Sequence, residues 1–248
     1  MEVHHPHHPT HKKKWSEYIL EFFMLFLAVT LGFFAENIRE GITEKHKKKE
    51  LLEAVVRDFE SDIAEIQRHR VLIKKRYDNC NHFVELLETD YKQVDKLDFY
   101  RTANWHAESK DLILNEKTRN DAESKGYFTN DGISDLSKIL NKFNYYYNDY
   151  KELNLGVLEG CKSYAANLIP LFIDPKLALK TDFVWLPNPT TTDRDFQGKL
   201  NNSIDQKVKD KIMFNIVYKR QLLMIELSDI DSLESYANKA ITIIKKSE

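Results

Sequence analysis

The chain has 248 residues, with 37 Lys and Arg against 39 Asp and Glu, so its formal net charge is −2. This near balance argues against a nucleic-acid-binding protein, because such proteins usually carry a strongly basic face. Charged residues make up 31% of the chain and apolar residues 42%, which excludes a largely disordered chain and a multi-span membrane protein. Only 7 Gly and 6 Pro are present. Because both residues interrupt helices, their scarcity predicts an all-α fold.

The N-terminal tail, residues 1–17, is rich in histidine and lysine. Its histidines form a cluster that two prolines interrupt: His4, His5, His7, His8 and His11. Imidazoles at this density can bind zinc, copper or nickel, but no carboxylate or cysteine completes a defined coordination shell. We therefore interpret the cluster as an adventitious ligand set, keep a specific metal site as the alternative, and expect no cofactor.

An apolar segment follows, and residues 18–37 are predicted to form a transmembrane helix. Residues 19–35 contain a single charge, Glu21, and a membrane span needs about 17 to 25 mostly apolar residues. Trp15 and Tyr18 precede the segment, where interfacial aromatic residues are common.

A secretory signal peptide is the alternative interpretation of this segment, because lysines precede a short apolar core. Signal peptides are cleaved after small residues, whereas the bulky Phe33 and Phe34 stand directly before Ala35. A retained membrane anchor is therefore predicted.

Basic residues flank the apolar segment on both sides. Lys12 to Lys14 precede it, and Arg39, Lys45 and the run from Lys47 to Lys49 follow it. The count alone favours a cytoplasmic C-terminal part, but large domains cross the membrane largely regardless of their charge. We expect the N-terminus in the cytoplasm and the large domain exported, with the opposite orientation as the alternative.

One face of the predicted transmembrane helix carries Glu21, Ala28 and Gly32. Ala28 and Gly32 form a small-xxx-small pair, which allows another helix to approach closely. A carboxyl group is costly where it faces lipid, so Glu21 should face protein or water. The three residues are therefore predicted to form a helix–helix contact. The alternatives are that Glu21 reaches the lipid headgroups or belongs to a proton pathway.

Residues 38–248 are predicted to form a helical bundle with long helices at about 44–97, 131–169 and 201–246. In the first helix, apolar residues alternate spacings of four and three, as in a coiled-coil heptad seam; the seam is Leu52, Val56, Phe59, Ile63, Ile66, Arg70, Ile73, Tyr77, Cys80, Val84, Leu87, Tyr91 and Val94. Further apolar neighbours widen this stripe, which is typical of a bundle. We expect an antiparallel bundle of three to four helices that continues from the membrane helix.

Three details of this bundle are less regular. A short helix is plausible over residues 107–117, and Gly156 and Gly160 are able to split the second long helix. Trp185 lies in a long connection after Pro170, which is interpreted as a partner surface or as a lid over the end of the bundle.

The sequence contains none of the motifs G-x-x-x-x-G-K, G-x-S-x-G, H-E-x-x-H and G-x-G-x-x-G, and an enzyme is not indicated. Cys80 and Cys161 lie on apolar helix faces, where a buried free thiol is the ordinary interpretation. If the domain is exported, a disulfide between them is the alternative.

The first 50 residues resemble an uncharacterised family of bacterial single-span membrane proteins. The resemblance rests on the His-Pro-rich start at Val3–His8, on the Lys13–Tyr18 stretch and on the apolar run Leu20–Glu36. A weaker likeness covers Gly132–Leu136 and the tyrosine pair Tyr146 and Tyr147. The resemblance implies a bacterial membrane protein and brings no activity, cofactor or catalytic residue with it.

Taken together, these features predict a membrane-anchored helical interaction or scaffold protein in the bacterial inner membrane, with a periplasmic bundle. Its expected partners are the lipid bilayer and either another protein or a second copy of the chain, bound through helices, and no nucleic acid. The alternative is a membrane-tethered sensory bundle that binds a small ligand.

Overall fold

The computed structural model of the chain describes residues 14–90, 93–106, 110–128, 134–172 and 204–247. In this part of the chain every regular element is a helix: α1 (Trp15–Glu88), α2 (Lys96–His106), α3 (Lys117–Ser124), α4 (Ser134–Asn167), α5 (Ile169–Phe172) and α8 (Gln206–Ser247). The prediction of an all-α chain is thus confirmed for the described residues. The chain divides into two compact units, residues 1–51 and residues 52–248, and α1 contributes to both.

The first unit contains the apolar part of α1. Its side chains are exposed from Lys14 to Lys47 apart from the partly exposed Thr30, whose hydroxyl donates to the carbonyl of Phe26 at 2.8 Å. This part of α1 is long and apolar enough to cross a membrane, and its most apolar 18-residue stretch is not buried by the rest of the chain. The helix continues through Gly41 without interruption.

α1 ends earlier than the sequence indicated. The helix expected over residues 44–97 is divided, because α1 stops at Glu88 and α2 starts at Lys96. The residues between them include no Gly or Pro, so the scarcity of helix breakers did not reveal the break. Capping chemistry marks it instead: the side chain of Asp95 accepts a hydrogen bond from the backbone N–H of Asp98 at 3.2 Å, which satisfies a donor left unpaired at the start of a helix.

The other predicted helices agree more closely with the structure. α4 and α8 occupy nearly the expected ranges, and neither Gly156 nor Gly160 interrupts α4. The short helix expected over residues 107–117 is wrong: residues 110–116 are not helical, and α3 follows them.

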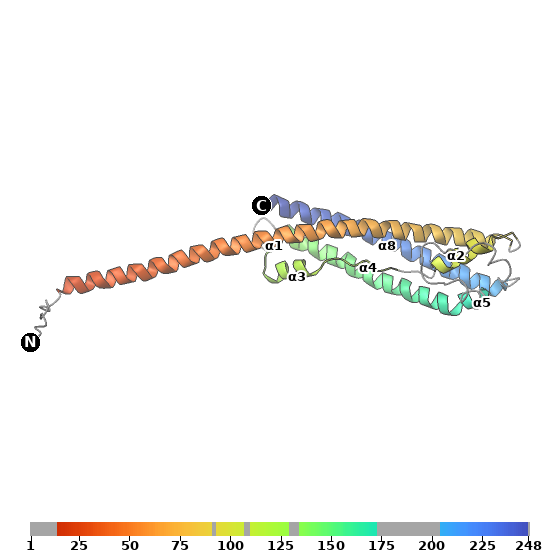
Figure 1. Cartoon of the computed structure of the whole chain (residues 1–248), viewed down its shortest axis with the longest axis horizontal. Helices are drawn as coiled ribbons and strands as arrows, with labels where there is room; N and C mark the ends of the chain where they lie inside the picture. Colours follow the sequence, from red (N-terminus) through yellow and green to blue (C-terminus); the bar gives the residue numbers. More distant parts are fainter. Residues whose placement is uncertain (1–13, 91–92, 107–109, 129–133, 173–203, 248) are drawn as a thin grey trace, which may run out of the picture. The chain divides into compact units, whose positions relative to one another are not determined.

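Between α1 and α4 the chain returns along the core of the second unit. Phe83 of α1 packs against Phe99 of α2 with ring centroids 5.5 Å apart, whereas the earlier Asp62 of α1 bonds to the later Asn115. The residue number in the connection rises as the number on α1 falls. The connection is therefore antiparallel to α1, as Figure 1 also shows.

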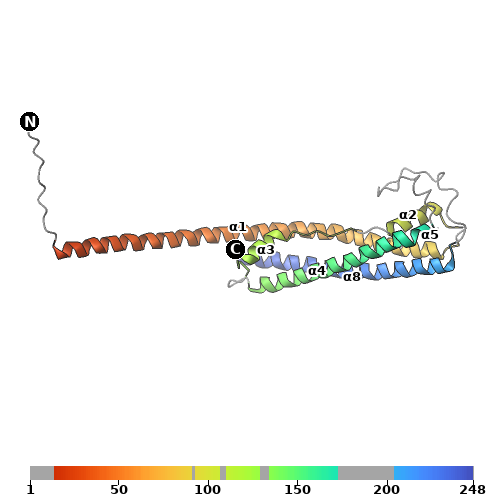
Figure 2. The same ribbon diagram turned by 90° about the horizontal axis from the view of Figure 1, so that it is seen from below.

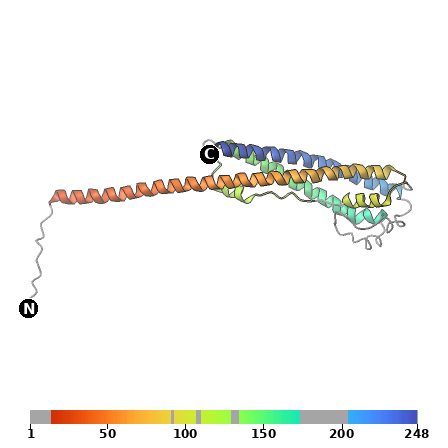
Figure 3. The same cartoon turned by 45° about the horizontal axis from the view of Figure 1, so that its top comes forward.

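This return makes α4 run in the same direction as α1. Phe59 of α1 packs edge-to-face on Phe143 of α4 at 5.2 Å, and Phe83 packs on Tyr164 at 6.4 Å. The residue numbers rise together along both helices. In Figures 2 and 3, α4 and the part of α1 after residue 52 follow this common direction within the second unit.

α8 runs in the opposite direction to both of these helices. The Lys245 ammonium lies 2.8 Å from Glu60 of α1, and the Arg220 guanidinium donates to Asn81 at 3.2 Å. An all-antiparallel bundle of three to four helices is therefore not confirmed. α8 is antiparallel to α1 and α4, but α1 and α4 are parallel to each other.

The core of the second unit consists largely of apolar columns at seven-residue spacing. All the side chains of these columns are buried: Phe59, Ile66, Ile73, Cys80 and Leu87 of α1; Leu136, Phe143, Tyr150, Val157 and Tyr164 of α4; and Ile216, Leu223, Ile230, Ala237 and Ile244 of α8. Burying one large apolar side chain stabilises a fold by about 1.5–3 kcal/mol. The columns therefore account for the close packing of the three long helices.

Candidate functional site

A second buried column of α1 is polar. Asp62, His69 and Arg76 lie seven residues apart, and only 1%, 1% and 6% of their surfaces are exposed. Side chains at this spacing project from the same side of a helix. Polar and charged groups are costly in a core unless they are paired. This polar column (Asp62, His69 and Arg76) therefore holds the most specific chemistry of the second unit, and it forms the centre of the candidate site.

The sequence analysis missed the polar column. The predicted seam ran through Ile63 and Arg70, but both of these residues are only partly buried, and Asp62 and His69 occupy the core positions instead. A search for apolar periodicity does not register a column made of polar residues. The available signal was the seven-residue spacing of Asp62, His69 and Arg76 beside an apolar column.

Asp62 forms the first layer of the site with a buried ion pair. Its carboxylate lies 2.6 Å from the guanidinium of Arg119, and it accepts hydrogen bonds from the backbone and the side chain of Asn115 at 2.9 and 2.8 Å. The Arg119 guanidinium also lies over the rings of Phe59 and Phe143 at 4.8 and 4.9 Å. Burial raises the pKa of Asp62, whereas these hydrogen bonds and the charge of Arg119 lower it.

His69 forms the second layer with Tyr150 of α4. Burial, assisted by the positive charge of Arg76, lowers the pKa of His69 to about 4, so the imidazole is neutral at pH 7. Burial also raises the pKa of Tyr150. The tyrosine hydroxyl therefore stays protonated and donates a hydrogen bond to His69 Nε2 at 2.7 Å, so the ring proton of the neutral imidazole is on Nδ1. Among the described residues, Nδ1 has no hydrogen-bond partner although it is buried.

Arg76 and Glu226 of α8 form the third layer. Glu226 has no exposed surface, and burial raises its pKa to about 7 against the opposing effect of Arg76 and Lys219. In the described part of the chain, Arg76 Nη1 and both carboxylate oxygens of Glu226 are buried without a hydrogen-bond partner. Buried polar atoms of this kind are rare and usually bind water or belong to a functional site.

His106 forms the fourth layer, where α2 meets the other helices. Its Nδ1 lies 3.7 Å from the Cys80 sulfur, its Nε2 lies 2.9 Å from Asn215, and its carbonyl accepts hydrogen bonds from Cys161 and Lys219. Burial lowers the pKa of His106 to about 3 and raises that of Cys80 to about 11. Both cysteines are buried, and neither forms a disulfide in the described part of the chain. The Cys80 thiol and the His106 imidazole are therefore both neutral at pH 7.

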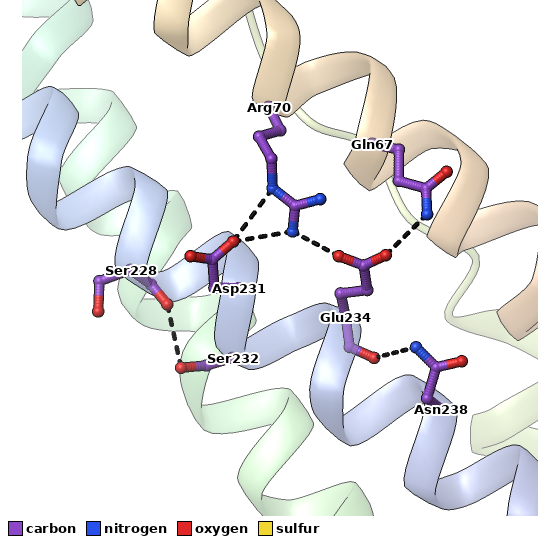
Figure 4. A network of polar contacts seen from close by, with 7 residues as sticks. All are labelled: Gln67, Arg70, Ser228, Asp231, Ser232, Glu234 and Asn238. Carbon is purple, nitrogen blue, oxygen red and sulfur yellow. Dashed lines mark hydrogen bonds and ion pairs between the residues drawn. The ribbon is translucent and has the colours of Figure 1, made fainter.

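A charge cluster on the solvent side joins α1 to α8, as Figure 4 shows. The Arg70 guanidinium lies 2.8 Å from Asp231 and 2.5 Å from Glu234, and Gln67 donates to Glu234 at 2.7 Å. The hydrogen bond from Gln67 and the pairing with Arg70 lower the pKa of Glu234. Arg70, which interrupted the predicted seam, is thus a surface contact to α8.

The outer face of α8 exposes large apolar side chains. Phe214, Tyr218 and Ile225 are 75%, 50% and 47% exposed, and their spacings of four and seven residues place them on one stripe. Further along α8, a shallow hollow of about 640 Å³ is lined by residues such as Ser228 and by Tyr146 of α4. The stripe and the hollow together make this surface of α8 apolar and uneven.

The predicted transmembrane contact lies on a face that the chain leaves open. Glu21, Ala28 and Gly32 are exposed, and a Cβ atom added at Gly32 would meet no atom within 4 Å. The helix–helix contact itself stays a prediction. The five tail histidines and Trp185 lie outside the described residues. Within the described ranges, no group of three or more His, Cys, Asp or Glu side chains is arranged to hold a metal ion.

Comparison of the chain with protein-family models, with curated proteins and with solved structures gives no match. The resemblance to bacterial single-span membrane proteins therefore stays a prediction, and the function has to be argued from the site itself.

Proposed function

We propose that the chain is a membrane-anchored interaction or scaffold protein whose helical unit binds another protein or a second copy of the chain. The observation that carries this proposal is the exposed stripe of Phe214, Tyr218 and Ile225 on α8. Exposed apolar groups that gather on one surface are typical of protein interaction sites. Their helical spacing favours a partner that presents a helix of its own.

The membrane anchor in this proposal is the apolar part of α1. Its length and composition suit a single span, and the flanking lysines together with the resemblance of the first 50 residues favour the bacterial inner membrane. In this arrangement the N-terminus is cytoplasmic and the helical unit is periplasmic. A reporter fused at the C-terminus tests the orientation, because a periplasmic reporter such as alkaline phosphatase is active only if the helical unit is exported.

Chemical crosslinking in native membranes, followed by mass spectrometry, tests the interaction. The wild-type chain should give a crosslinked species, and Phe214→Ser with Ile225→Ser should remove most of it. Val71→Ser is the matched control, because Val71 is 52% exposed on α1 rather than on α8. Recovery of the wild-type chain only as an uncrosslinked monomer would count decisively against the proposal.

A sensory function is the second candidate, and the buried layer of Arg76 and Glu226 favours it. Polar atoms without partners in a core are suited to bind a small polar molecule or water. Thermal-shift screening of the full chain in detergent against metabolites tests this function, with Glu226→Gln as the variant that should lose the response. If no compound raises the melting temperature of the wild-type chain, ligand sensing is the weaker explanation.

A further inference from the structure

The core of the second unit contains the elements of a proton-linked switch. We propose that protonation of Glu226 controls how tightly α8 packs against α1. This inference does not depend on the binding partner in the proposed function, because it concerns the inner face of α8 rather than the exposed stripe.

The geometry isolates the Glu226 carboxyl group from solvent. Glu226 is completely buried, and both its oxygens lack hydrogen-bond partners among the described residues. It lies on the inner face of α8, seven residues after the buried Lys219. Arg76 lies on the stretch of α1 that faces Glu226. Two contacts between the antiparallel helices bracket this stretch: Arg70 with Glu234, and Asn81 with Arg220.

The charged and titratable groups that face Glu226 come from all three long helices. They are Arg76 on α1, Tyr150 on α4, and Lys219 and Asp229 on α8. Burial and the negative charge of Asp229 disfavour the carboxylate of Glu226, while Arg76 and Lys219 favour it; burial is the largest effect and raises the pKa of Glu226 to about 7. The pKa of Asp229 is also raised, to about 6, by burial and by the negative charge of Asp149.

The folded chain therefore holds a proton on Glu226 that the unfolded chain has already released. Because the pKa rises from 4.5 to about 7 on folding, the stabilising contribution of this group is fully present below pH 4.5 and is lost as the pH rises through about 7. Above that pH the core contains a charged carboxylate, which attracts water and weakens the packing of α8. His69 and His106 have lowered pKa values, so their contributions to stability are lost as the pH falls rather than as it rises. The effect of Glu226 therefore has to be isolated with a variant.

Hydrogen exchange of the full chain in nanodiscs of phosphatidylcholine and phosphatidylglycerol tests the switch. Peptides around residue 226 are compared between wild type and Glu226→Gln at pH 6 and at pH 8, so that the intrinsic pH dependence of exchange cancels at each pH. The ratio of the wild-type exchange rate to the variant rate should rise about tenfold between these pH values, since it changes about tenfold per pH unit below the folded pKa of about 7 and levels off above it. Glu152→Gln, at an exposed site on α4, should give a constant ratio.

A second variant leaves the carboxyl group in place. Arg76→Met removes a charge that favours the carboxylate, so α8 should match wild type at pH 6 and exchange faster than wild type at pH 8. The proposal is wrong if the ratio of the wild-type exchange rate to the Glu226→Gln rate is the same at pH 6 and pH 8. It is also wrong if the exchange rates of Arg76→Met and wild type change equally between these pH values. Neither outcome affects the crosslinking test, because both variants leave Phe214 and Ile225 unchanged.

Discussion

The two parts of α1 show opposite relations between composition and burial. Before residue 52 the helix is mostly apolar and its side chains are exposed, whereas after residue 52 it contains charged residues that are buried. Phe22 and Phe26, for example, are more than half exposed, while Asp62 and His69 are 1% exposed. The same helix thus places its apolar residues outward in one unit and its polar residues inward in the other.

This contrast teaches that the surroundings of each part, rather than its hydrophobicity, determine which side chains are buried. An apolar helix without a protein partner is suited to lipid, where the backbone groups are satisfied within the helix. A polar column is suited to a core only if other helices supply its partners, as Arg119 and Tyr150 do. Four experiments test this difference between the two parts of α1 and the contacts behind it.

The largest effect is expected where a buried charge loses its partner. Asp62→Ala leaves the Arg119 guanidinium buried and uncompensated, and it should lower the free energy of unfolding by about 3–5 kcal/mol. Urea unfolding of the full chain in detergent, followed by circular dichroism, measures the change. The double variant Asp62→Leu with Arg119→Met removes both charges and should lose much less stability. A loss below about 1 kcal/mol for Asp62→Ala would show that the buried ion pair is not needed.

The next effect concerns the pH dependence of the second unit. The pKa of His69 is lowered from 6.5 to about 4, so its stabilising contribution is present above pH 6.5 and is lost as the pH falls through about 4, by on the order of 3 kcal/mol. His69→Gln keeps an acceptor for Tyr150 and does not titrate. Urea unfolding at pH 7 and pH 4.5 should show a smaller acid sensitivity in this variant. His82→Gln, at a partly exposed site, is the control, and equal sensitivity in all three chains would contradict the prediction.

A smaller effect is expected in the apolar part of α1. Gly32→Leu blocks close approach of a second helix and should weaken association in the membrane by about 1 kcal/mol. An association assay on the isolated segment in a bilayer compares it with Leu31→Ala, which lies off the face of Glu21, Ala28 and Gly32. Equal association of wild type and both variants would leave Glu21 as a residue that reaches the headgroups.

The smallest effect is expected at the surface contact between α1 and α8. Arg70→Ala removes the contacts with Asp231 and Glu234, and exposed ion pairs typically contribute about 0.2–1 kcal/mol. Urea unfolding at low and high salt separates this contribution, because salt screens exposed charges more than buried ones. Arg68→Ala, a surface pair with Glu65 within α1, is the control. A loss as large as that of Asp62→Ala would place Arg70 among the essential core contacts.

The helical class and the long helices follow from the sequence because they depend on local properties. Scarce Gly and Pro and a repeating apolar pattern are sufficient to predict helices near α4 and α8. The break between α1 and α2 was missed because no helix breaker marks it; the local signal is the side chain of Asp95, which caps the start of α2. The parallel direction of α1 and α4 was missed because the connection between them had no clear pattern of its own.

The site was less predictable than the fold. Glu21 and Gly32 stand out in an apolar segment, but a contact between chains is not determined within one chain. Asp62 and Glu226 look like ordinary surface residues until the helices are placed together, because each acquires its role from another element. Burial, which raises the pKa of Glu226, is a property of the tertiary packing.

The arrangement of the long helices also determines the order in which the second unit is completed. Contacts between α1 and α8 join residues 167 positions apart at Gln67 and Glu234, and 185 positions apart at Glu60 and Lys245. Chains emerge from the ribosome N-terminus first, and contacts between distant residues form slowly. Asp62 and His69 have partners in segments that precede α8, whereas the layer of Arg76 and Glu226 cannot form until α8 has emerged. α8 therefore closes the core after α1 and α4 have been made, and shortening the chain before α8 should leave the second unit open to proteases.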